Sequence, residues 1–254
     1  VNYLILQRKW FILIDLMYLH FSYLFSRKTY YIMLSLVLVY LIGVTYFSRF
    51  YLSEAELLFD REFYYNEYML ESINLGKIMI VLFNFVLITN SFVFNKYDYF
   101  LISRKPRKKV IFSKIFIVFI ISTIYTFMLV ILLYLIPSFL TPYMLPDNFF
   151  IIARLLAVFS AYYLALFTFI IIIFKHIYFL FFSFACFLVS FLSSEFLIEK
   201  NQSSSFNAFI SLLFPDITRF INFGYDFLYG SIFVLSLTIG LILVSIKHYT
   251  ICDI

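Results

Sequence analysis

Long apolar runs constrain this chain more than any other feature of its sequence. A helix needs about 20 mostly apolar residues to cross about 30 Å of hydrocarbon. The chain has 254 residues, of which 64% are hydrophobic and 13% charged, and a single soluble core cannot bury that much apolar surface. The sequence therefore predicts an all-α integral membrane protein with one domain over residues 1–254. Six transmembrane helices are expected at residues 29–48, 77–95, 115–136, 149–174, 177–194 and 227–246.

The segment before the first of these spans is apolar but carries charges. Arg8, Asp15 and Ser22 are seven residues apart, which places them on one side of a helix. Trp10 suits the depth of a membrane interface. We expect an amphipathic helix that lies in the interface, with Asp15 and His20 in contact with water. The alternative is a seventh span.

The distribution of basic residues predicts the orientation of the chain. With the N-terminus inside, the inner segments hold 13 basic and 3 acidic residues, whereas the outer segments hold 4 basic and 11 acidic residues. Basic residues are enriched in cytoplasmic loops. The sequence thus predicts a multi-pass protein of the cytoplasmic membrane with both termini in the cytoplasm. The net charge of +5 is what remains of this asymmetry and does not indicate a nucleic-acid partner.

The inner segment between the second and third spans, residues 96–114, carries seven of the 19 basic residues. Residues 96–102 can form a short helix. Pro106 suits the first turn of the next helix, so residues 107–114 are expected to continue into the third span. On charge alone, contact with anionic lipid headgroups is favoured over a protein partner as the explanation of this segment.

Two outer segments are also distinctive. Residues 48–77 are acidic and aromatic, and we expect a solvated, helical loop without a calcium-binding pattern. In residues 193–226, Pro215 separates two short apolar stretches, 206–214 and 217–223. Each stretch is too short to cross the membrane, so both are expected to be short re-entrant helices at the outer leaflet before the last span.

Arg154 is the one clear charge inside a predicted span. It lies seven residues after Asp147, which places it about 10 Å below the outer end of its helix. Two interpretations stay open. The side chain can extend to the interface, or it can pair with an acid or line a pathway within the bundle.

The residues of a catalytic or nucleotide-binding site do not appear in the sequence. The five glycines form neither GxGxxG nor GxxxxGK[ST], and the three histidines and two cysteines have no metal-ligand spacing. We therefore expect no enzyme activity, metal or cofactor in this chain itself.

Taken together, these segments resemble the ABC-2 type permease family, the membrane subunits of many bacterial ABC exporters. Members typically have an N-terminal elbow helix, six spans, a cytoplasmic coupling helix between spans two and three, and re-entrant helices before span six. Residues 1–28 resemble the elbow. The coupling segment of the family often reads as an acid, an aromatic or leucine pair, a basic-Pro-basic turn and a Ser-Lys pair. Here the corresponding residues are Asp98, Tyr99-Phe100-Leu101, Arg104-Lys105-Pro106-Arg107 and Ser113-Lys114.

The resemblance implies several partners. A separate ABC ATPase would bind ATP and magnesium, and a second permease, either a copy or a paralogue, would complete the unit. It also implies export of an apolar or amphipathic cargo, which is a peptide, a lipid or a drug. The most similar-looking members are small peptide exporters of low-GC Gram-positive bacteria. The residues that would couple to the ATPase are Tyr97, Asp98, Tyr99, Phe100, Leu101, Arg104, Lys105, Pro106, Arg107, Lys108 and Lys109.

Other membrane functions stay open at this point. A subunit that senses or scaffolds without transporting would have the same features. An ion-driven secondary transporter usually has internal repeats and buried acids, and the six predicted spans contain neither. An intramembrane enzyme would need clustered acids, histidines or a serine–histidine pair within the spans, and these are missing as well.

Overall fold

The chain is helical in a computed structural model, in which residues 14–22, 29–57, 61–93, 107–140, 149–198 and 226–251 are described. The predicted all-α class is confirmed for this part of the chain, which contains no strand. After a helical segment at residues 14–22, the elements are α2 (Thr29–Leu57), α3 (Arg61–Ile88), the π-helical turn η1 (Thr89–Val93), α5 (Arg107–Leu140), α6 (Phe149–Phe174), α7 (Ile177–Ile198) and α10 (Asp226–Ile251).

Among the described residues, five helices are long and apolar enough to cross a membrane. Their apolar stretches are Tyr30–Tyr51, Glu67–Phe92, Arg107–Phe139, Ile152–Phe174 and Val234–Ile251. The predicted span at residues 177–194 lies in α7, where the described apolar stretch, Ile177–Leu188, is shorter. The chain therefore has the helices of a multi-pass membrane protein, and the sixth span stays a prediction.

The helix that contains the second predicted span begins before that span. The span is expected from residue 77, whereas α3 begins at Arg61 and includes Glu67 and Glu71. Carboxylates near the end of a span can reach the interface, so they do not stop the helix. The expected helical character of residues 48–77 is therefore confirmed for the described residues, which belong to α2 and α3.

The predicted end of the third span was wrong. The span was expected to end at residue 136, yet α5 continues through Pro137 to Leu140. A proline has no backbone N–H, so the carbonyl of Leu133, four residues earlier, loses its helical donor. The Tyr68 hydroxyl of α3 donates to this carbonyl at 2.8 Å. The expected start of the helix, directly after Pro106, agrees with Arg107 as the first residue of α5.

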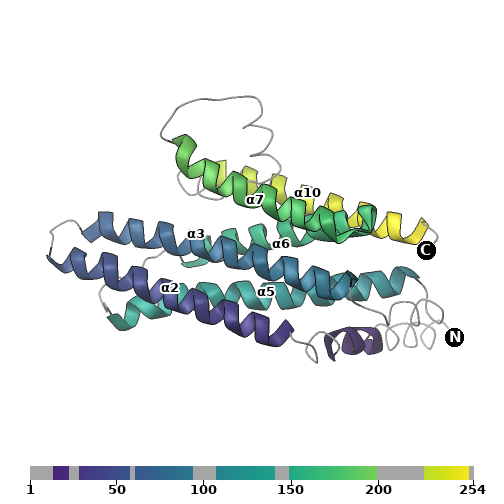
Figure 1. Cartoon of the computed structure of the whole chain (residues 1–254), viewed down its shortest axis with the longest axis horizontal. Helices are drawn as coiled ribbons and strands as arrows, with labels where there is room; N and C mark the ends of the chain where they lie inside the picture. Colours follow the sequence, from purple (N-terminus) through teal and green to yellow (C-terminus); the bar gives the residue numbers. More distant parts are fainter. Residues whose placement is uncertain are drawn as a thin grey trace.

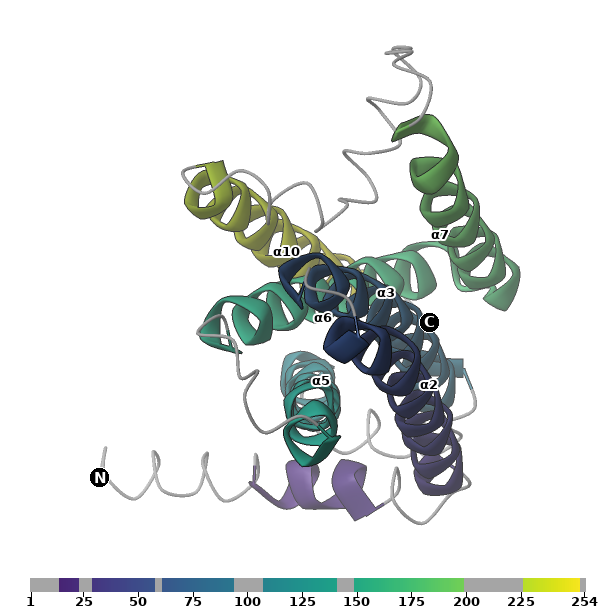
Figure 2. The same cartoon turned by 90° about the vertical axis from the view of Figure 1, so that its left-hand side faces the viewer.

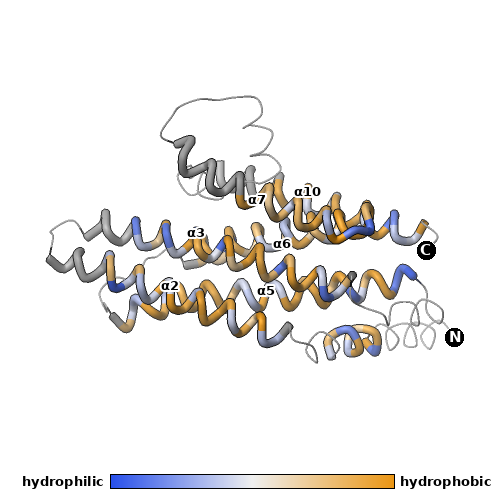
Figure 3. The backbone as a smooth tube through the Cα atoms, viewed as in Figure 1, coloured by the Kyte–Doolittle hydropathy of each residue, from blue (hydrophilic) through white to orange (hydrophobic). Residues whose placement is uncertain are grey.

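Consecutive long helices run in alternating directions, so their ends gather at two ends of a bundle (Figure 1). One end holds most of the described basic residues, and its α5 terminus is hydrophilic (Figure 3). We call it the basic end, defined by Arg107, Lys108, Lys109, Lys114, Lys175 and Lys247. The opposite, acidic end has the helical residues Glu54, Glu56, Glu62, Glu67, Glu71, Glu195 and Asp226, together with Arg49, Arg61 and Arg154.

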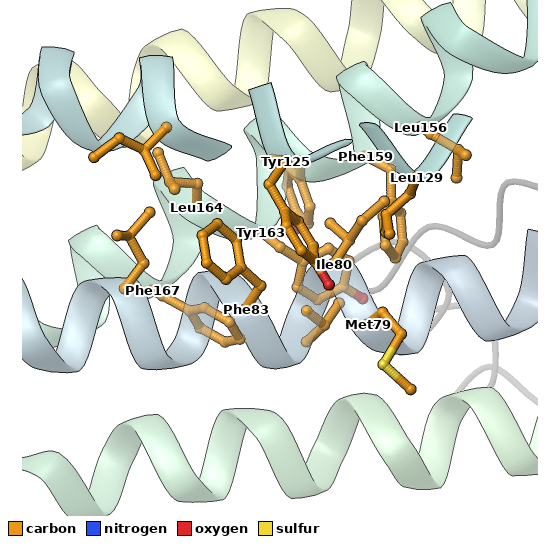
Figure 4. Packing of buried hydrophobic residues seen from close by; sticks show 14 of the residues in the cluster. Met79, Ile80, Phe83, Tyr125, Leu129, Leu156, Phe159, Tyr163, Leu164 and Phe167 are labelled. Atoms are coloured by element: carbon orange, nitrogen blue, oxygen red, sulfur yellow. The ribbon is translucent and has the colours of Figure 1, made fainter. Parts of the chain in front are cut away.

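The core lies along α3 and α6. Of the residues in their apolar stretches, 72% and 67% are buried, compared with 22% for α2 and 17% for α10, which are peripheral. Figure 2 shows α7 at the edge of the bundle, where it contacts α6 and α3. In the centre, the ring of Phe83 stacks on that of Tyr125 with centroids 4.0 Å apart, among aliphatic side chains (Figure 4).

The segment at residues 14–22 runs across the direction of the long helices, beside the first half of α5 (Figures 1 and 2). It turns Leu16 and His20 into the bundle, where both are buried, and exposes Asp15, Tyr18 and Ser22. The exposed residues also include the apolar Ile14, Leu19 and Phe21, so the expected amphipathic helix in the interface stays a prediction. The expected contact of His20 with water was wrong, because only 3% of its surface is exposed.

Candidate functional site

The predicted coupling residues divide into two groups. Tyr97, Asp98, Tyr99, Phe100, Leu101, Arg104, Lys105 and Pro106 lie outside the described residues, as do the expected re-entrant helices at 206–223. Arg107, Lys108 and Lys109 form the first turn of α5. Lys108 is exposed there, whereas Arg107 and Lys109 are half-buried. The basic turn expected after Pro106 is therefore part of a continuous 34-residue helix.

Two turns further along α5, Lys114 lies at a junction of three elements. Only 3% of its surface is exposed. Its Nζ lies 4.5 Å from the centroid of the Phe92 ring, which belongs to η1. A buried ammonium group is costly unless nearby groups compensate its charge, and the face of an aromatic ring does so in part. Lys114 therefore links the start of α5 to the turn that precedes residues 94–106.

His20 brings the segment at residues 14–22 to the same junction. Its Nε2 is buried and has no hydrogen-bond partner. Burial, together with the charge of Lys114, lowers the pKa of His20 to about 4. The imidazole is therefore neutral at physiological pH, because a second positive charge beside Lys114 would be buried without compensation. We call His20, Ser91, Phe92 and Lys114 the basic-end junction.

A second polar group joins three helices at the centre of the bundle. Ser122 of α5 donates to Asn84 Oδ1 of α3 at 2.6 Å, and its Oγ lies 2.7 Å from Ser160 Oγ of α6. Asn84 Nδ2 donates to the Ser160 carbonyl at 3.0 Å. All three side chains are buried. They hold the helices together as interhelical hydrogen bonds do in other membrane bundles.

The buried charge of the central bundle is Lys77, not Arg154. Lys77 is 2% exposed, and its Nζ donates to Asn74 Oδ1 at 3.2 Å. Arg154 is exposed on α6 near the acidic end, which favours extension of its side chain to the interface. The second predicted span begins at Lys77 itself, whereas the helix that contains this residue begins at Arg61. Lys77, Asn84 and Ser91 recur every seven residues, and this spacing could have identified a polar stripe on α3.

Neither polar group has the composition of a catalytic or metal site. Within the described ranges, no three His, Cys, Asp or Glu side chains gather as metal ligands. No family model, curated protein or solved structure matches this chain. Three polar features of the described residues therefore bear on function: the basic-end junction, the central Asn84 group and the buried Lys77.

Proposed function

We propose that this chain is the membrane permease subunit of an ATP-driven ABC exporter of the ABC-2 type. The supporting observation is the arrangement at the basic end. There the turn η1 and the helical segment at residues 14–22 lie next to Lys114, which is two turns into α5. Residues 94–106, which contain most of the proposed coupling residues, connect two of these three elements. An input of force at this loop would therefore act on both neighbouring helices.

The energy for transport would come from a separate ATPase, since this chain has no glycine-rich phosphate-binding loop. Acidic side chains of that ATPase would meet Arg104, Lys105, Arg107 and Lys108. Because α5 is continuous over 34 residues, a displacement of Arg107 would be carried about 50 Å along the bundle. In this proposal the basic end faces the cytoplasm, and the six spans and the elbow helix are those of the family.

The cargo would be an amphipathic peptide or another largely apolar molecule. The peripheral helix α2 exposes large apolar and aromatic side chains along its length, including Tyr31, Ile42 and Tyr46. Lipid or a second permease would cover this surface, and a path between two such surfaces would accept apolar groups. The acidic end, which would face outward, would attract cationic peptides.

The test of this proposal is charge reversal on the first turn of α5. Arg107→Glu with Lys108→Glu should uncouple ATP hydrolysis from export, while the amount of protein in the membrane stays unchanged. The matched control is Lys247→Glu, which reverses an exposed charge at the same end on α10. If the α5 variant couples normally, or if both variants uncouple to the same extent, an ATPase does not dock at the first turn of α5. The basic residues there would then serve only to bind anionic lipids.

One observation favours a second candidate, an ion-driven secondary transporter. Lys77 is a buried ionisable group within a span, and such groups often mark ion pathways. In that case Lys77→Met would abolish transport driven by an ion gradient without ATP. Transport that needs ATP and ignores the gradient would rule this candidate out.

A further inference from the structure

The basic-end junction contains an irregular turn between α3 and residues 94–106. The π-helical turn η1 (Thr89–Val93) follows α3 directly and precedes residues 94–106. A π turn holds one more residue than the α-helix would, and short π segments are frequent at functional sites. If the same residues formed an α-helix instead of the π turn, everything after the turn would rotate by about 100° and shift by about 1.5 Å. The junction could therefore change register by a small local step.

Phe92 is the side chain that such a step would move. In the described state its ring lies under the buried ammonium of Lys114. The ring is partly buried against the core. A rotation of about 100° would turn Phe92 away from Lys114, and the ammonium would then lose this cation–π contact.

Two buried polar atoms at the junction are unsatisfied in the described state. Ser91 Oγ in η1 and His20 Nε2 in the segment at residues 14–22 have no hydrogen-bond partner, and both residues are nearly fully buried. Buried polar atoms without partners are rare in proteins and usually have a specific reason. Here they lie on the two elements that interact with Lys114, so a rearrangement that frees one element would allow both atoms to be satisfied.

We propose that η1, Lys114 and the segment at residues 14–22 form a two-state latch. In the closed state Phe92 lies under Lys114, and His20 is seated beside it. In the open state η1 becomes α-helical, Phe92 leaves Lys114, and the segment at residues 14–22 is released from α5. A role of the latch in transport, in which movement of residues 94–106 would open it, rests on the proposed function. The latch itself is a property of this chain.

The test is hydrogen–deuterium exchange of the full chain in lipid nanodiscs, without an ATPase. Phe92→Leu should lower amide protection in residues 14–22 and 89–93 by the same factor, about tenfold, because it removes the contact with Lys114. His20→Leu should raise protection in both segments, because it removes an unsatisfied buried atom and keeps an apolar contact. The control Phe112→Leu changes an exposed ring on α5 and should alter neither segment.

Deletion of Ser91 gives an independent test, because it removes the extra residue of the π turn while Phe92 keeps the position that it has in the closed state. The latch predicts that residues 14–22 then stay at least as protected as in the unaltered chain. Effects confined to the element that carries each change, or a loss of protection in residues 14–22 after the deletion, would overturn the latch. A chain that exports with ATP while its two segments exchange independently would contradict the latch alone. A chain with a coupled latch and no ATPase partner would contradict the proposed function alone.

Discussion

His20 illustrates how burial decides the chemistry of a single side chain. The sequence predicts that His20 contacts water on an amphipathic helix, whereas in the fold it is buried near Lys114. A neutral imidazole can stay there, whereas an imidazolium cannot without opening the junction. The seated helix at residues 14–22 should therefore depend on pH.

Acidification should release this helix. The pKa of His20 falls from its ordinary value of 6.5 to about 4 when the helix is seated, so the released helix takes up the proton first. The seated state is fully favoured above pH 6.5 and should lose roughly 2–3 kcal/mol as the pH falls to about 4. The fluorescence of Trp10, the only tryptophan of the chain, should report the release in nanodiscs. His20→Leu should remove the transition, and an unchanged pH profile in this variant would contradict the assignment.

For single charged residues, the sequence shows which side chains are present but not what surrounds them in the fold. Arg154 was identified because it interrupts an apolar run, yet its side chain is exposed. Lys77 was missed because it stands at the edge of such a run, yet it is buried. Which face of a helix is covered depends on its neighbours, and a single apolar sequence does not encode that when lipid and protein are equally apolar.

Pro137 and Tyr68 connect two elements through one carbonyl. Tyr68→Phe should lower the free energy of unfolding by about 1 kcal/mol, because it leaves the Leu133 carbonyl without the donor that Pro137 cannot supply. Pro137→Ala restores that backbone donor. In a double-mutant cycle, measured by chemical denaturation in detergent, Tyr68→Phe should therefore cost much less when Pro137 is replaced. Additive effects of the two substitutions would show that the hydroxyl does not compensate for the proline.

Helices α2 and α3 approach each other closely at Gly43. A Cβ at this position would overlap the end of the Leu75 side chain, whereas a Cβ at Gly240 of α10 would meet nothing within 4 Å. Gly43→Leu should therefore destabilise the bundle by about 1–3 kcal/mol, and Gly240→Leu should be nearly neutral. Thermal unfolding of the purified protein measures both. Equal losses for the two glycines would contradict the packing of α2 on α3.

The apolar runs of the sequence predict most of the helices. They do not predict the residues at which these helices begin and end. The uncharged run from residue 77 marks only part of α3, because the helix also includes Glu67 and Glu71. The third span was expected to end at residue 136, whereas α5 continues through Pro137 because a hydroxyl from another helix compensates for the missing donor. The end of α5 therefore depends on a contact that is distant in sequence.

The whole molecule has a basic end and an acidic end, and this asymmetry predicts its orientation. In a background without Cys186 and Cys252, Lys108→Cys and Lys247→Cys should react with a membrane-impermeant maleimide only after the cytoplasmic side is opened. Arg49→Cys, which is exposed at the acidic end just after the first predicted span, should react in intact cells. Labelling of Lys247→Cys from outside would contradict the six-span arrangement with both ends inside.

The most direct test of the proposed function is ATP-dependent uptake of a cationic amphipathic peptide into inside-out membrane vesicles that contain this chain and the ATPase that co-purifies with it. The account predicts stoichiometric co-purification of an ATPase with a glycine-rich phosphate-binding loop. It also predicts uptake that requires ATP and this chain and that is lost when the phosphate-binding lysine of the ATPase is replaced. Purification of the chain without any ATPase, together with uptake that is the same with and without ATP, would contradict it.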